Sequence, residues 1–216
     1  MKRIFAIVGL VLFLSTKVCA YDDNDFQIWH TENQEFKVSK ESKITLEEEF
    51  RWADDASDFY YQHYDAGFVY SLDKHLALGA NCRQVYEKKK GKFKEENRPH
   101  LNATLKYEIH GFKLDDRNRI EYRHFDYQAD SWRYRNKFTV KLPLYLTRFD
   151  IQPYVADEIF VELANGLLNR NRLYSGLSFN VTKNIKGEVY YLFQSSKSSG
   201  QWTDTNVFGT KLKLVF

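Results

Sequence analysis

Charged residues at every second position mark the stretch of the chain most able to do chemistry. They form two runs, which read in order Arg117, Arg119, Glu121, Arg123 and then Arg133, Arg135, Lys137. Guanidinium groups this close together could attract an anion, or they could pair with carboxylates in a structural network. We expect the structural network and keep an Arg-lined anion site or pore as the functional alternative.

The residues between these charges predict the element that positions them. Ile120, Tyr122 and Trp132, Tyr134 alternate with the charged set, and period-two alternation is the signature of a strand with two different faces. The polar YQADS segment between the runs predicts a hairpin. With Gln128 at the turn centre, the expected opposed pairs are Arg123 with Arg133, Glu121 with Arg135, and Arg119 with Lys137.

One carboxylate, Glu121, cannot balance this much positive charge in a partly dehydrated interior. We therefore expect acidic residues from other strands to complete the network. The candidates on matching faces are Glu158 and Glu162, or Glu47 and Glu49 next to Arg51.

Alternation continues through most of the chain and predicts an all-β fold. About eleven segments of roughly ten residues carry it, a length that suits a tilted transmembrane β-strand. The expected connections include two polar loops, 87–97 and 195–204, which are longer than the turns at 72–74 and 182–186. We predict an antiparallel up-and-down β-barrel of ten to twelve strands. We prefer twelve, because single-chain bacterial barrels have even numbers.

The first twenty residues predict a cleaved signal peptide. Lys2 and Arg3 precede an apolar run that is too short to span a bilayer, and small residues follow at the expected cleavage site after Ala20. Acylation of Cys19 is the alternative. The exported part, 21–216, is then a single barrel domain in which Cys82 is the one remaining cysteine.

Loss of the signal peptide also changes the charge balance. The whole chain has 32 Lys and Arg against 29 Asp and Glu, and Lys2, Arg3 and Lys17 leave with the signal. The exported chain is therefore neutral, and its composition predicts no nucleic-acid partner.

Three features favour a membrane barrel over a soluble lipocalin-like one. The connections alternate in length, aromatic residues recur near segment ends, and the chain closes on an apolar face that ends in an aromatic residue. That face carries Leu212, Leu214 and Phe216, which we interpret as an assembly signal. The predicted location is the outer membrane of a Gram-negative bacterium, and the predicted partners are outer-membrane lipid and the barrel assembly machinery, with the protein a monomer.

Catalytic chemistry has weaker support. His63 and Asp65 share a strand face, as do His100 and Asn102, and Ser175 and Ser178 are the nearest serines, but no nucleophile, zinc or phosphate-binding motif occurs. We expect no enzyme activity, no catalytic or metal-binding residues, and no cofactor. The alternatives kept are a barrel enzyme acting on lipid or peptide, and a soluble periplasmic ligand-binding barrel.

Several segments resemble a known family. They are ITLEEEFRW (44–52), RNRIEYR (117–123), WRYRNKF (132–138), IQPYVADEIF (151–160), NRNRLYSG (169–176) and the closing strand. The resemblance is to an uncharacterised family of bacterial outer-membrane proteins catalogued as a domain of unknown function. It implies an outer-membrane β-barrel and carries over no activity and no site residues.

Overall fold

The computed structural model describes residues 23–145, 147, 149–198 and 200–216, so the predicted signal peptide lies outside the described residues. The described chain forms eleven strands, and it contains no helix long and apolar enough to cross a membrane. The strands are β1 (Asp25–Lys37), β2 (Ser42–Ala53), β3 (Asp58–Ser71), β4 (Leu76–Lys89), β5 (Lys92–Ile109), β6 (Phe112–Phe125), β7 (Ser131–Lys141), β8 (Gln152–Glu162), β9 (Leu167–Asn180), β10 (Ile185–Ser198) and β11 (Gln201–Val215).

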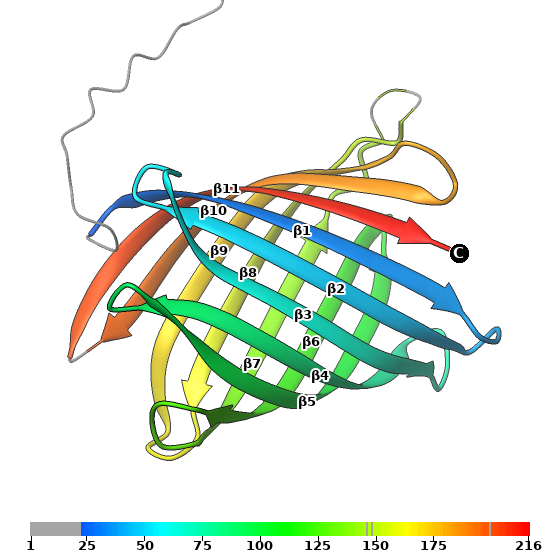
Figure 1. Cartoon of the computed structure of the whole chain (residues 1–216). Coiled ribbons are helices and arrows are strands. Elements are labelled where there is room, and N and C mark those ends of the chain that lie inside the picture. The colour runs from blue at the N-terminus through cyan, green and yellow to red at the C-terminus, as the bar shows by residue number, and fades with distance from the viewer. Residues whose placement is uncertain (1–22, 146, 148, 199) are drawn as a thin grey trace, which may run out of the picture.

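The strands close into one barrel. Each strand pairs antiparallel with its sequence neighbours, and β1 pairs with β11 in parallel, from Asp25 opposite Thr205 to Glu35 opposite Val215. Figure 1 shows these two arrows side by side and pointing the same way. An odd number of up-and-down strands requires this seam, because the first and last strands then run in the same direction.

The all-β barrel prediction is confirmed in outline and needs two corrections. The described residues give eleven strands, not the preferred twelve, because the first segment forms the single strand β1 and does not divide in two. The pairing is also not wholly antiparallel, since the seam between β1 and β11 is parallel.

The barrel has two rims, which we name by the chain end nearest to each. The N-terminal rim carries the start of β1 and the turns after β2, β4, β6, β8 and β10. The C-terminal rim carries Phe216 and the turns after β1, β3, β5, β7 and β9. The side view in Figure 1 shows the start of β1 and the C-terminus at these opposite ends.

The predicted alternation of short and long connections is wrong. Strands β4 and β5 extend through most of 87–97 and meet at a two-residue turn, Lys90 and Gly91, both with positive φ. Such a turn matches the twist of a hairpin. Strands β10 and β11 likewise run through most of 195–204. The charged and small residues of 87–97 and 195–204 give these segments the composition of loops, although most of them lie in paired strands. The longest connection lies at the C-terminal rim, between Lys141 and Gln152.

The central hairpin is formed by β6 and β7, but its register differs from the prediction by two residues. Glu121 lies opposite Arg133, Arg119 opposite Arg135, and Arg123 opposite Ser131. The connecting loop explains the shift, because Asp130 turns back to accept a hydrogen bond from the Phe125 N–H at 3.1 Å, which centres the turn on Tyr127. A shift of two keeps every side chain on its predicted face.

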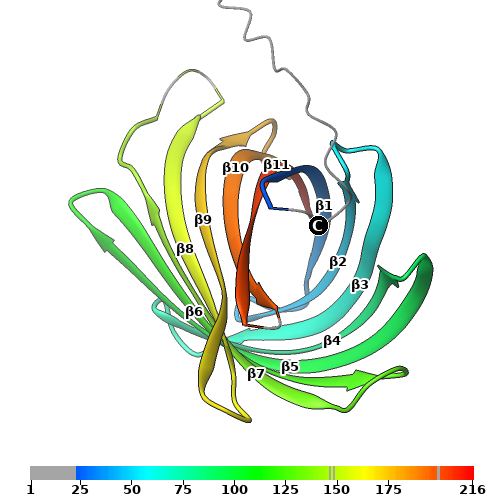
Figure 2. The ribbon, with the colours of Figure 1, turned by 90° about the vertical axis from the view of Figure 1, so that its left-hand side faces the viewer.

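The barrel is polar inside and apolar outside, and Figure 2 shows the wall of strands that separates the two surfaces. Every strand exposes at least one large apolar side chain on the outer face, among them Phe26, Ile44, Leu101, Phe138 and Leu173. Buried charged residues instead line the interior, including Arg83, Arg98, Glu121 and Glu158.

Candidate functional site

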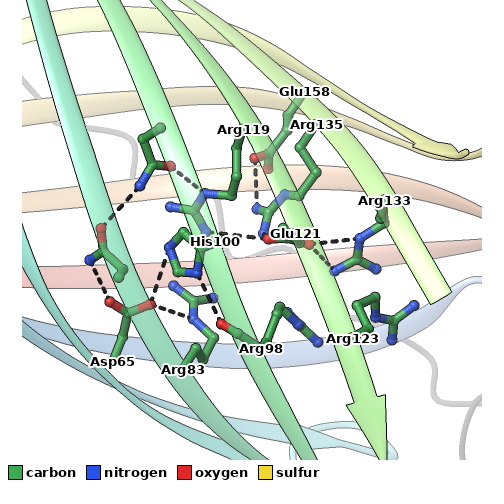
Figure 3. Close-up of polar contacts among 12 residues, drawn as sticks. Asp65, Arg83, Arg98, His100, Arg119, Glu121, Arg123, Arg133, Arg135 and Glu158 are labelled. Atoms are coloured by element: carbon green, nitrogen blue, oxygen red, sulfur yellow. Dashed lines mark hydrogen bonds and ion pairs between the residues drawn. The ribbon is translucent and has the colours of Figure 1, made fainter. Parts of the chain in front are cut away.

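Glu121 lies at the centre of the interior charge network, fully inaccessible to solvent. Arg133 donates to its Oε2 from Nε and Nη2 at 2.8 and 2.6 Å, and Arg135 donates to Oε1 at 2.8 Å. Arg119 reaches Oε1 at 3.4 Å. Figure 3 shows this carboxylate between guanidinium groups carried by β6 and β7. The short charge-assisted bonds fix both strands of the hairpin to one buried anion.

Glu158 on β8 is the second buried carboxylate. Its Oε1 accepts hydrogen bonds from Arg135 at 2.8 Å and from Arg117 at 3.2 Å. Its Oε2 accepts one from the Tyr174 hydroxyl at 2.9 Å. Arg135 therefore bridges Glu121 and Glu158, and the network passes from β6 through β7 to β8 without a break.

A third group lies nearer the N-terminal rim. Arg98 and Arg123 both donate to Glu96, Arg98 at 2.7 and 2.8 Å and Arg123 at 2.8 and 3.1 Å. Arg123 also reaches Glu162 at 3.4 Å. Glu162 thus joins the network through Arg123 and does not contact Glu121.

The candidates on β2 lie away from the central hairpin and join its network through a chain of polar side chains: Arg83, Asp65, Asn81, Asn102 and Arg119. Glu47 accepts from Arg83 at 3.0 Å and from Lys211 at 3.2 Å. Glu49 pairs with Arg51, whose Nε donates to it at 2.6 Å. The structure thus brings Glu158 and Glu162 to the central hairpin, whereas Glu47 pairs with Arg83 and Lys211, and Glu49 pairs with Arg51.

Lys137 is the exception among the predicted network residues. Its Nζ lies 3.6 Å from the centre of the Tyr174 ring, a cation–π contact, and it forms no ion pair among the described residues. Arg117, which lies opposite Lys137 on β6, reaches Glu158. On the C-terminal side of the network, Lys137 is therefore a cation that lies opposite Glu158 in the sheet without forming an ion pair with it.

Two aromatic residues complete the lumen filling, and both are almost fully buried. Trp29 lies under Arg51 at 3.6 Å and under Arg172 at 4.8 Å. Phe160 contacts Arg135 at 4.5 Å and Arg172 at 4.8 Å. Stacked guanidinium groups bury their faces on the rings while their edges remain free to donate.

Glycines make room for a third aromatic residue. Tyr190 on β10 lies between Gly176 on β9 and Gly209 on β11, which are its direct cross-strand neighbours. A Cβ added at Gly209 would lie 2.0 Å from the Tyr190 ring, closer than any real contact. Lack of a side chain at Gly209 therefore lets the tyrosine lie along the wall, where it packs with Tyr174, Leu192 and Val207.

Three of the residues considered for catalysis are held in structural contacts: His63, Asp65 and Ser178. His63 is bonded to the Tyr61 hydroxyl at 3.1 Å and to Glu47 at 3.4 Å, and Asp65 accepts from Arg83 at 2.8 Å. Ser178 donates to the Gln152 carbonyl, and among the described residues neither His63 nor His100 is hydrogen-bonded to a serine. Within the described residues, no group of three His, Cys, Asp or Glu side chains could hold a metal ion. Cys82 is a free thiol on the outer face.

Sequence reasoning missed several members of the network. Glu96 fell in the segment predicted to be a loop, and Arg98 lies directly after it. Their signal was present, because the alternation of His100 and Asn102 continues backwards through Arg98 to Glu96. Trp29 is out of phase with Phe26 and Ile28, and that phase directs it inward.

The predicted assembly residues lie along the end of β11 on the outer face. Phe216 stacks on Phe36 of β1, with ring centres 4.9 Å apart and planes 10° apart. Its backbone N–H donates to the Glu35 carbonyl at 2.8 Å. The last residue therefore completes the seam between the first and last strands, with Leu212 and Leu214 preceding it on the same face.

Comparison with known proteins gives a family and no activity. A family model described as "Protein of unknown function (DUF2490)" matches residues 26–205. The searches of curated proteins and of solved structures gave no match. Because the family match runs from β1 into β11 and covers well over half of the chain, this protein belongs to that family of unknown function.

Proposed function

We propose that this protein is an outer-membrane β-barrel whose lumen is filled by an Arg/Glu network, with a structural role and no open channel. Export by the N-terminal signal peptide and assembly through the Phe216 strand are parts of the same proposal. The protein is a stable structural component of the membrane, and the charge network holds its strands together from inside the barrel.

The observation that carries the membrane part is the inverted polarity of the barrel. Large apolar side chains are exposed on all eleven described strands, while charged groups are buried inside. Soluble proteins rarely expose apolar surface that continues around the whole molecule. A bilayer covers such a surface, and closure of the strands leaves no unpaired edge in lipid.

The outer face also carries polar residues in mid-strand. On β6 to β9, these residues satisfy one another: Asn136 donates to Asp116 at 2.5 Å, and Asn171 donates to Asp157 at 2.6 Å. On β1 and β2, Glu32 lies directly opposite Glu48, and like charges in that position destabilise a sheet. A membrane location makes Glu48 a costly residue, so its replacement by an apolar residue should stabilise the barrel in lipid.

The structural role rests on how completely the lumen is filled near the N-terminal rim. Each of the eleven strands contributes at least one inward side chain that is more than nine-tenths buried, and Trp29, Glu121, Phe160, Leu192 and Val207 are among the most buried. Small barrels are commonly filled in this way. This filling supports the proposal of a lumen without an open channel.

Cell fractionation followed by gel migration tests the proposal. The full chain, expressed in a Gram-negative host, should be found in the outer-membrane fraction, and the unheated sample should migrate differently from the boiled one. Phe216→Ala should reduce the membrane-inserted fraction, whereas Val38→Ala, an equally exposed apolar change in the turn after β1, should leave it unchanged. Recovery of the wild type in the soluble periplasmic fraction would refute the membrane assignment.

A further inference from the structure

The C-terminal half of the lumen is a cavity, in contrast to the filled N-terminal half. Its volume is about 410 Å³, and it extends from Arg83 and Arg119 in mid-barrel to Lys43 and Lys106 near the C-terminal rim. A second hollow of about 270 Å³ adjoins it at the mouth, sharing Lys141 and Lys213 with it. The cavity is large enough for a small molecule of ordinary metabolite size.

Cations outnumber acids in the wall of this cavity. The nine cationic residues are Lys43, Arg83, Lys106, Arg117, Arg119, Lys137, Lys141, Lys211 and Lys213, and the five acids are Glu35, Glu47, Asp65, Asp115 and Glu188. The wall therefore has an excess of four positive charges, although the exported chain as a whole was predicted to be neutral. Low-dielectric walls concentrate such a field within the cavity.

The ion pairs leave specific cations free. Glu35 accepts both Lys43 and Lys213 at 2.7 Å, and Glu47 accepts Arg83 and Lys211. Among the described residues, Lys106, Lys137 and Lys141 form no ion pair. Lys137 lies opposite Glu158 in the sheet and faces the Tyr174 ring, and Lys141 faces the Tyr154 ring.

Arg117 adds a partly free donor beside Lys137. Its guanidinium shares Glu158 with Arg135, and its side chain remains 36% exposed toward the cavity. Arg117 lies directly opposite Lys137 across β6 and β7, so the two cations are presented together. A guanidinium next to an ammonium suits an oxyanion with more than one negative charge.

We propose that this cavity binds a small multivalent oxyanion, with Arg117 and Lys137 at its floor and Lys106 and Lys141 nearer the mouth. The acids in the wall, Asp115 and Glu188 among them, disfavour a long polyanion that would have to pass every charge. Phosphoryl and carboxylate groups share the chemistry that these cations recognise. The inference rests on the lumen geometry and not on membrane location, so either proposal can fail alone.

Calorimetric titration of the purified folded barrel at low ionic strength tests the inference, because salt screens such contacts. Inorganic pyrophosphate and citrate are the two probes, and they distinguish phosphoryl from carboxylate recognition. We expect saturable binding of at least one probe, weakened tenfold or more by Lys137→Gln and by Lys141→Gln. Neither lysine forms an ion pair, so both variants should fold.

Lys74→Gln is the matched control. Lys74 lies in the turn after β3 at the same rim but outside the cavity wall, and its loss should change the affinity less than twofold. No saturable heat with either probe would overturn the proposal. So would affinity that is unchanged in Lys137→Gln and Lys141→Gln, because binding would then lie elsewhere on the barrel.

Discussion

Replacement of Glu121 by Gln should be the most damaging single change of charge in the barrel. The substitution keeps the size of the side chain and removes the negative charge that faces Arg133, Arg135 and Arg119. Arg135 retains Glu158, but Arg133 has no other carboxylate partner among the described residues. Two short bonds to a charged acceptor would be weakened, and one buried guanidinium would be left uncompensated.

The expected magnitude follows from these contacts. A hydrogen bond to a charged group contributes about 1.5–3 kcal/mol, and breaking a buried ion pair by removing one partner costs about 3–5 kcal/mol. Because Arg135 keeps a second partner and Arg133 does not, we expect a loss of about 3–5 kcal/mol in the free energy of unfolding. Arg133→Gln should lose a similar amount. The double variant should lose less than the sum, since the two residues share one interaction.

Urea unfolding of the barrel in detergent or lipid vesicles, followed by tryptophan fluorescence, measures this loss. Glu95→Gln is the matched control, because Glu95 is an exposed glutamate on β5 whose neutralisation should change stability by less than about 0.5 kcal/mol. If Glu121→Gln matched Glu95→Gln in stability, the network would not hold the barrel together, and the structural account would be refuted.

Three further predictions test separate parts of the account. Gly209→Ala should lower the free energy of unfolding by about 1–3 kcal/mol, because the added methyl group overpacks against Tyr190. Adding Tyr190→Leu to this variant should recover part of the loss. An unchanged urea midpoint in Gly209→Ala would contradict this packing. Glu48→Leu should stabilise the barrel by about 1 kcal/mol more than Glu48→Gln in lipid, because both variants relieve the repulsion from Glu32 and only Leu gains from contact with lipid; equal effects of the two variants would contradict the membrane location. Hydrogen bonds from His124, Tyr122 and the Phe125 N–H lower the pKa of Asp130 from 3.8 to about 2. The contribution of Asp130 to the stability of the turn should therefore be complete above pH 4 and lost as the pH falls through 2. The Phe125 amide signal in NMR measures this titration, and a midpoint near pH 4 would exclude the hydrogen bond.

Alternation in the sequence was sufficient to predict the fold class and the two faces of the strands. It placed Arg119, Glu121 and Arg135 on one face, which is the interior. Periodicity is set locally by the pleat, so it survives errors in register and strand length. The offset of two residues in the central hairpin left every face unchanged for this reason.

The remaining features depend on contacts that local patterns do not contain. The register of β6 and β7 is decided by Asp130 in the loop, and the extent of β4 and β5 by pairing between two highly charged segments. The parallel seam depends on the total number of strands. The alternation with Arg98 and His100 indicates that Glu96 faces inward, but its pairing with Arg123 depends on 87–97 being strand and not the predicted loop.

Single-channel recording in planar bilayers tests whether the lumen is closed by the buried side chains between Trp29, Glu121 and Phe160. Wild-type barrel, shown by its heat-modifiable migration to be folded and inserted, should give no steady conductance in either direction of applied voltage. A steady conductance proportional to voltage in the wild type would contradict the account, because ions would then pass through the layer that the network is proposed to fill.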